Sequence, residues 1–101
     1  MGALSVSVKE TVKTEILISA EIMKKQSIGM LADTIGENIA ESHSISPYKS
    51  QIQSAIFEGL QRFQQNEKDF LVNVFKNFTL KVTANGDDCV LSLIENTVTI
   101  K

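Results

Sequence analysis

Apolar and polar residues alternate along the first fifth of the chain. From Leu4 to Ile22 the even positions are mostly apolar and the odd positions mostly polar. This period of two is typical of a β-strand, because successive side chains of a strand point to opposite faces. The pattern predicts two strands, or one long bent strand, with a break near Lys9 to Thr11. The alternative is a helix with an apolar stripe through Val8, Val12, Ile16, Ala20 and Met23.

The period changes to that of a helix after Lys25. Apolar residues then recur at spacings of three and four, at Ile28, Leu31, Ile35 and Ile39. This spacing predicts an amphipathic helix over about residues 27–42, with Ser27 as its N-cap. Ser46 and Pro47 predict the start of a second helix, because proline is well suited to the first helical position.

The second helix has its apolar side at Ile52, Ile56, Leu60 and Phe63. A break near Gln65 and Asn66 keeps Glu67 out of the apolar side, since an unpaired buried carboxylate is strongly unfavourable. Asn66 then caps a predicted third helix, in which Asp69 lies in the first turn. The inner face of this helix consists of Phe70, Leu71, Val74 and Phe75.

Strand periodicity returns at Phe78 and continues to the C-terminus. Asn85 and Gly86 predict a hairpin, because this dipeptide favours a tight two-residue turn. A possible turn at Glu95 and Asn96 precedes the last strand residues. The sequence therefore predicts one α+β domain over residues 1–101, in the order ββ-ααα-βββ. Two or three central helices cover one face of an antiparallel sheet made of N-terminal and C-terminal strands.

The charge pattern argues against a nucleic-acid partner. The formal net charge is −2, and acids are interleaved with the lysines of the first quarter. Arg62 is the only arginine, although arginine is the usual reader of guanine and phosphate. Apolar runs are too short for a membrane span of about 18 residues or more. The lone Cys89 excludes an intramolecular disulfide, so we expect a cytoplasmic protein.

The residues that carry out catalysis are scarce in this sequence. The chain has one His, one Cys and one Tyr, and nothing requires His43 to lie near Cys89. The expectation is therefore an inert buried thiol and an exposed histidine. Asn85 to Asp88 lacks the ligand spacing of a calcium loop, and two soft ligands are too few for zinc. The sequence predicts a protein that is not an enzyme and has no metal or cofactor.

Small residues form a stripe on the first helix. They recur at spacings of three and four, at Gly29, Ala32, Gly36 and Ala40. Glycine inside a helix costs about 1 kcal/mol relative to alanine, so the stripe needs a reason. Close packing against a neighbouring element is one explanation. A contact surface, or a space for a small ligand, is the other.

The second helix carries the predicted protein-binding face. Phe57 lies at the edge of its apolar side, and the neutral amides of Gln53, Gln61 and Gln64 dominate its exposed side. Neutral side chains are desolvated more easily than charged ones, which suits a contact surface. Alternatively, Phe57 folds back onto the core or onto Phe75.

Three functional hypotheses follow from these features. The first is a non-enzymatic protein-binding module, such as an inhibitor, an adaptor or an immunity or phage-accessory factor. It acts as a homodimer formed through the sheet edges, because unpaired edges often join across a two-fold axis. The second is a sensor of a small ligand or nucleotide that uses the small-residue stripe. The third, a DNA-binding regulator, requires the lysines between Lys9 and Lys25 to converge.

Overall fold

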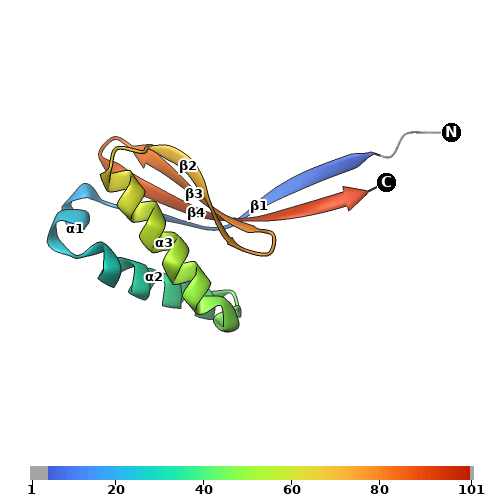
Figure 1. The fold of residues 1–101 in the computed structure, drawn as a ribbon, viewed down its shortest axis with the longest axis horizontal. Helices are drawn as coiled ribbons and strands as arrows, with labels where there is room; N and C mark the ends of the chain where they lie inside the picture. Colours follow the sequence, from blue (N-terminus) through green and yellow to red (C-terminus); the bar gives the residue numbers. More distant parts are fainter. Residues whose placement is uncertain (1–4, 101) are drawn as a thin grey trace.

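The computed structural model describes residues 5–100 and shows an α+β fold (Figure 1). Within this range four antiparallel strands form one sheet, in the order β1-β4-β3-β2. The elements are β1 (Val6–Ile18), α1 (Ala20–Lys25), α2 (Ile28–Ser42), a 3₁₀ turn (Ser46–Tyr48), α3 (Lys49–Gln64), β2 (Asp69–Phe75), β3 (Phe78–Asn85) and β4 (Asp88–Ile100). The predicted α+β class is confirmed, but within residues 5–100 the sheet has four strands, with one N-terminal strand instead of two, in the order β-α-α-α-β-β-β.

The N-terminal pattern forms one strand followed by a short helix. β1 is continuous through Lys9 to Thr11, and its irregularity is a bulge between Val12 and Thr14. The predicted strand character of residues 20–22 is wrong, because these residues begin α1. Ser19 caps this helix by accepting a hydrogen bond at Oγ from the Ile22 N–H, at 3.2 Å. Leu4 lies outside the described residues.

The next two helices agree with the sequence pattern. Ser27 is the N-cap of α2, and its Oγ accepts a hydrogen bond from the Met30 N–H at 3.2 Å. Ser46 and Pro47 open the 3₁₀ turn that leads into α3. The buried residues of α3 include the predicted apolar side at Ile52, Ile56, Leu60 and Phe63.

The predicted third helix is wrong, because residues 69–75 form β2. Asn66 ends the preceding helix in a left-handed conformation, with φ at +72°, instead of capping a new one. Phe70 and Val72 also fit a period of two, and both lie opposite apolar residues of β3. Pairing with β3 satisfies the backbone of this segment, so the tertiary partner decides between two patterns that the sequence allows.

The C-terminal hairpin is confirmed at the predicted position. Asn85 pairs with Asp88, and Gly86 has φ at +63°, a conformation that glycine adopts readily. The predicted turn at Glu95 and Asn96 is wrong, because β4 continues to Ile100. Both residues pair with β1, and this pairing keeps the strand extended.

The core lies between the helices and one face of the sheet. It combines residues from α2 and α3 with strand residues such as Leu80, Leu91 and Leu93. Val82 and Cys89 are also fully buried there. This helix-covered face is the apolar side of the sheet over most of its width.

The long strands β1 and β4 extend past the rest of the molecule (Figure 1). Their outer segments, Val6 to Glu10 and Asn96 to Ile100, pair with each other beyond the end of β3. We call this two-stranded segment the arm and the remainder the body. The Cα atoms span 60 × 30 × 16 Å, and the radius of gyration is 15.2 Å. A compact chain of this length has a radius of gyration of about 13 Å, and the arm explains the difference.

Candidate functional site

The bulge in β1 changes which face of the sheet is apolar. Residues directly opposite each other in an antiparallel pair point to the same face. Ile16 lies opposite Leu91, on the helix-covered face, whereas Val12 lies opposite Ile94, on the other face. An extra residue in one strand reverses the side on which the following side chains lie. The even positions of β1 therefore point away from the helices in the arm and toward them in the body.

Most exposed apolar side chains lie on the face opposite the helices, which we call the open face. Among the described residues ten large hydrophobic side chains are exposed, and seven of them point to this face. Their exposed fractions lie between 56 and 66%. The seven residues are Val6, Val8, Val12, Leu17, Leu71, Val98 and Ile100.

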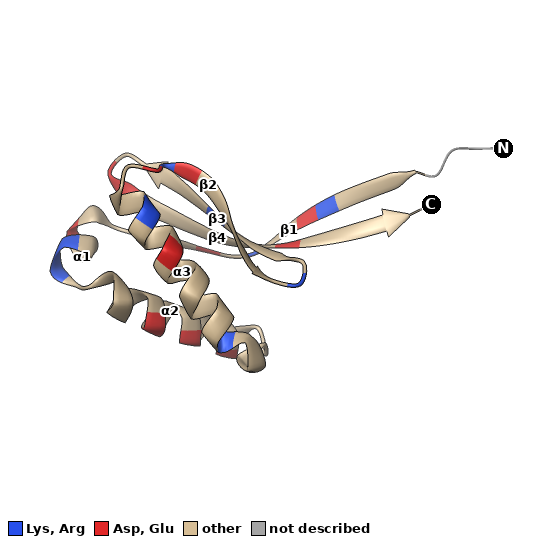
Figure 2. Cartoon of the chain, viewed as in Figure 1, with Lys and Arg blue, Asp and Glu red and all other residues tan. Residues whose placement is uncertain are grey.

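The outer end of the arm is an uncharged apolar patch. Val6 lies opposite Ile100, and Val8 lies opposite Val98. Figure 2 shows no charged residue on the described outer ends of these two strands. The nearby ion pair joins Lys13 Nζ to Glu95 Oε1, at 3.8 Å, and Glu95 belongs to the opposite face. The arm therefore has one apolar and one polar side, as a strand pair in a two-layer structure does.

Hydrogen bonds between Asn77 and Asn96 fix the base of the arm. The Asn96 N–H donates to the Asn77 carbonyl, and the Asn77 side-chain amide donates to the Asn96 carbonyl, both at 2.8 Å. Asn96 Nδ2 also donates to Thr79 Oγ1 at 3.1 Å. These bonds pair the backbone N–H and carbonyl of Asn96 at the point where β3 no longer runs beside β4. They therefore fix the direction in which the arm leaves the body.

Two residues of the predicted α3 face, Gln53 and Phe57, lie where α3 meets α2. Gln53 Nε2 donates to the Asp33 carbonyl at 3.0 Å, so this amide holds the two helices together. Phe57 is 40% exposed and lies beside Gly29. Phe75, the alternative partner of Phe57, instead stacks on Tyr48 with ring centroids 4.0 Å apart. Gln61 and Gln64 are exposed. Phe57 and Gln53 also line a hollow with Asp33, Ser50 and Ser54.

The small-residue stripe of α2 faces α3 and the core. Ala32 and Ala40 are buried, and a Cβ at Gly36 would lie 2.5 Å from Gln53 Cγ. At Gly29 the nearest atom to such a Cβ is Phe57 Cε2, at 4.0 Å. α3 therefore fills the space beside Gly36 and leaves ordinary contact distance beside Gly29.

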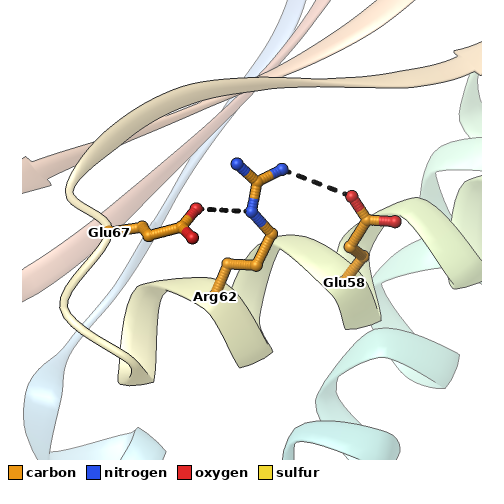
Figure 3. Close-up of polar contacts among 3 residues, drawn as sticks. All are labelled: Glu58, Arg62 and Glu67. Carbon is orange, nitrogen blue, oxygen red and sulfur yellow. Dashed lines mark hydrogen bonds and ion pairs between the residues drawn. The ribbon is translucent and has the colours of Figure 1, made fainter.

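The only arginine is held by two acidic side chains (Figure 3). Arg62 Nε donates to Glu67, and Arg62 Nη1 lies 3.4 Å from Glu58 Oε2. The guanidinium also lies over the Phe70 ring, 4.0 Å from its centroid. These contacts join the end of α3 to the start of β2, and they occupy the side chain best suited to bind phosphate.

Cys89 is buried among the core side chains of the sheet. Burial raises the pKa of its thiol to about 11, against a smaller lowering effect of Lys68. A thiol with this pKa remains protonated at neutral pH and is a weak nucleophile. His43 caps the C-terminal end of α2 and is half-buried, so the predicted exposed histidine is wrong.

The raised pKa of Cys89 predicts a loss of stability at alkaline pH. The unfolded thiol ionises near its ordinary pKa of 9.0, whereas the folded thiol keeps its proton up to about pH 11. Between these values ionisation of the thiol stabilises the unfolded state alone. The free energy of unfolding therefore falls, by at most about 2–3 kcal/mol for a shift of this size. Urea unfolding at pH 8 and pH 10.5 measures the loss. Cys89→Ala should remove this part of the pH dependence, and an unchanged dependence would contradict the prediction.

The hairpin loop and the other acidic residues offer no metal site in the described chain. Within residues 5–100 no three His, Cys, Asp or Glu side chains gather closely enough to hold a metal ion. Asp88 Oδ1 instead accepts a hydrogen bond from the Ala20 N–H at 2.8 Å, which ties α1 to β4. Among the same residues no helix is long and apolar enough to cross a membrane.

The open face is a surface that the sequence pattern concealed. The valines at positions 6, 8 and 12 share their parity with Ile16 and Ile18, so one continuous core-facing strand fits the sequence equally well. Two features of the sequence could have revealed the open face. The odd positions of the arm carry no apolar residues, and the arm is far along the chain from the predicted helices.

No family model matches the chain, and no curated protein or solved structure matches it either.

Proposed function

We propose that this protein is a non-enzymatic module that binds another protein through the open face of its sheet. The observation that carries the proposal is the concentration of seven exposed apolar side chains on that face. Large exposed apolar patches are rare on monomeric proteins and commonly mark interaction sites. Inhibitors, adaptors and immunity or phage-accessory factors all act through such contacts.

The character of this face favours a protein partner over a small ligand or DNA. The open face consists of extended strands, whereas small-molecule sites are concave and enclosed. Its charged residues include Glu10, Glu15 and Lys81, so the surface is not basic. The sensor hypothesis relies on the stripe beside Gly36, where α3 already fills the space.

The state of the only cysteine supports a non-catalytic role. Cys89 is fully buried and its thiol pKa is raised to about 11, which makes it a poor nucleophile. A lone reduced cysteine is also compatible with the cytoplasm, where we propose that the protein acts. The exposed part of the predicted α3 face, formed by Phe57, Gln61 and Gln64, is a second contact surface under this proposal.

Photo-crosslinking in cells of the source organism tests which surface is used. A photoreactive amino acid is placed at Val98 on the open face, at Gln61 on α3, or at Lys24 on α1 as the control. We expect a discrete crosslinked protein from the Val98 variant and none from the Lys24 variant. An adduct from Gln61 alone would move the binding site to α3. A folded Val98 variant without any protein adduct would contradict the proposal.

A further inference from the structure

The midpoints of the two long strands lie opposite each other in the sheet. Val12 is the middle residue of β1 (Val6–Ile18), and Ile94 is the middle residue of β4 (Asp88–Ile100). These two residues lie opposite each other in the sheet. Six residues of β4 lie on each side of Ile94, which corresponds to about 20 Å of strand in each direction. The two halves of this strand pair, on either side of Val12 and Ile94, are therefore equal in length.

Apolar pairs on the open face are placed symmetrically about this centre. On the arm side Val98, paired with Val8, is four residues from Ile94. On the body side Val90, paired with Leu17, is also four residues from Ile94. All four side chains point to the open face, since Val90 and Val98 have the same parity as Ile94. A rotation of 180° about the Val12 and Ile94 pair exchanges the position of the Val8 and Val98 pair with that of the Leu17 and Val90 pair.

We propose that the occupant of the open face is a second copy of this chain. The two copies pack open face to open face about a two-fold axis that passes over the Val12 and Ile94 pair, perpendicular to the strands. The Val8 and Val98 pair of each copy then lies on the Leu17 and Val90 pair of the other. This inference rests on the proposed function and names the partner of the same surface.

The chain's own helices cannot cover the arm in this way. α2 and α3 lie against the opposite face of the body, and the bulge between Val12 and Thr14 directs the apolar side of the arm away from them. A two-stranded ribbon is marginally stable in water when nothing covers its apolar side. Packing two sheets face to face gives each arm the second layer that it lacks.

The available area suits a modest but specific dimer. Full burial of a Val, Leu or Ile side chain removes roughly 60–120 Å² of apolar surface at about 25 cal/mol per Å². Seven such side chains, each somewhat over half exposed, offer roughly 250–500 Å² of apolar surface per copy. With a polar rim in the usual proportion, the interface approaches the lower end of the range around 800 Å² per partner. We therefore expect dissociation on the order of micromolar.

The charged residues near the centre oppose association, so the interface must be held by apolar contact. Glu10 and Glu15 lie opposite Asn96 and Ser92, two residues from Ile94 on either side, so the half-turn brings Glu10 of one copy near Glu15 of the other. Lys81 lies opposite Ser92 on β3 and adds a positive charge to the same row. Because salt screens the repulsion between these acidic side chains, dimer affinity should rise as salt is raised.

Sedimentation velocity of the whole chain tests the dimer. We expect reversible dimers at tens of micromolar, and at least a tenfold weaker association for Val98→Lys, which places a charge in the apolar patch. Met30→Lys is the matched control, because Met30 is 63% exposed but lies on α2. Circular dichroism confirms that each variant is folded. A monomer at several hundred micromolar, or an equal loss with Met30→Lys, would overturn the second copy as the occupant.

A crosslinking experiment tests the position of the two-fold axis. Val98→Cys and Leu17→Cys are made separately in the Cys89→Ala background, and the two proteins are mixed with a short bismaleimide. The proposed axis predicts mixed Val98→Cys and Leu17→Cys dimers in preference to dimers of either variant alone. Preferential Val98→Cys self-crosslinking would overturn this arrangement. If the chain is monomeric while the Val98 photo-crosslink captures a different protein, the proposed function stands and only the second copy is excluded.

Discussion

Leu60→Ala is expected to lower the free energy of unfolding by about 2–5 kcal/mol. Leu60 lies on α3 and is fully buried between this helix and the sheet. Truncation to alanine removes buried apolar atoms and leaves a cavity that the surrounding residues fill incompletely. Because a small domain is stable by only about 5–15 kcal/mol, this single change removes a large share of its stability.

Urea denaturation at low protein concentration measures this loss without a contribution from association. Met30→Ala is the control, because it truncates a large apolar side chain that is exposed on α2. We expect the control to change the free energy of unfolding by no more than about 0.5 kcal/mol. Equal losses in the two variants would mean that α3 does not pack on the sheet as described.

Gly36→Ala and Gly29→Ala are expected to change stability in opposite directions. At Gly36 the added methyl group would lie 2.5 Å from Gln53 Cγ and 3.0 Å from Gln53 Cα. The Gln53 side chain can move, but its backbone can retreat only if α3 shifts away from α2. Overpacking of this kind costs about 1–3 kcal/mol, more than the roughly 1 kcal/mol that alanine gains over glycine in a helix.

Gly29 serves as the matched control on the same helix. Its nearest neighbour, Phe57 Cε2, lies 4.0 Å from the position of an added Cβ, which is an ordinary contact distance. Gly29→Ala should therefore raise the free energy of unfolding, by up to about 1 kcal/mol. Thermal and urea unfolding of both variants give the comparison. Stabilisation by Gly36→Ala would show that the helices are farther apart at this point than the structure indicates.

Local signals of the sequence were sufficient where one segment determines its own structure. Ser27 and the apolar spacing after it predicted α2, because a cap and a helical stripe need no distant partner. Asn85 and Gly86 predicted the hairpin between β3 and β4, because the turn depends on glycine's tolerance of positive φ. Segregation of strand and helix patterns then predicted the α+β class.

The errors arose where two patterns fit the same residues. Phe70, Leu71, Val74 and Phe75 have helical spacing, but Phe70, Val72 and Val74 also alternate as in a strand. The connection to β3 contains no glycine or proline, and its Lys76 adopts φ at +46°. At Glu95 and Asn96 the polar residues suggested a turn, but pairing with β1 keeps β4 extended.

The predicted contact surface on α3 follows from local spacing, whereas the open face depends on strand pairing. The glutamines and Phe57 could be placed on one side of a helix from their spacing alone. By contrast, the open face depends on a single extra residue in β1, which reverses the arm relative to the body.

The sequence by itself determined the class of the fold, the capped helix α2 and the C-terminal hairpin, because each follows from neighbouring residues. Only the tertiary structure decided that residues 69–75 are a strand and that the apolar side of the arm faces away from the helices. Strand pairing joins residues far apart in the chain, and a change of register or a bulge alters the exposed face without altering the apolar pattern.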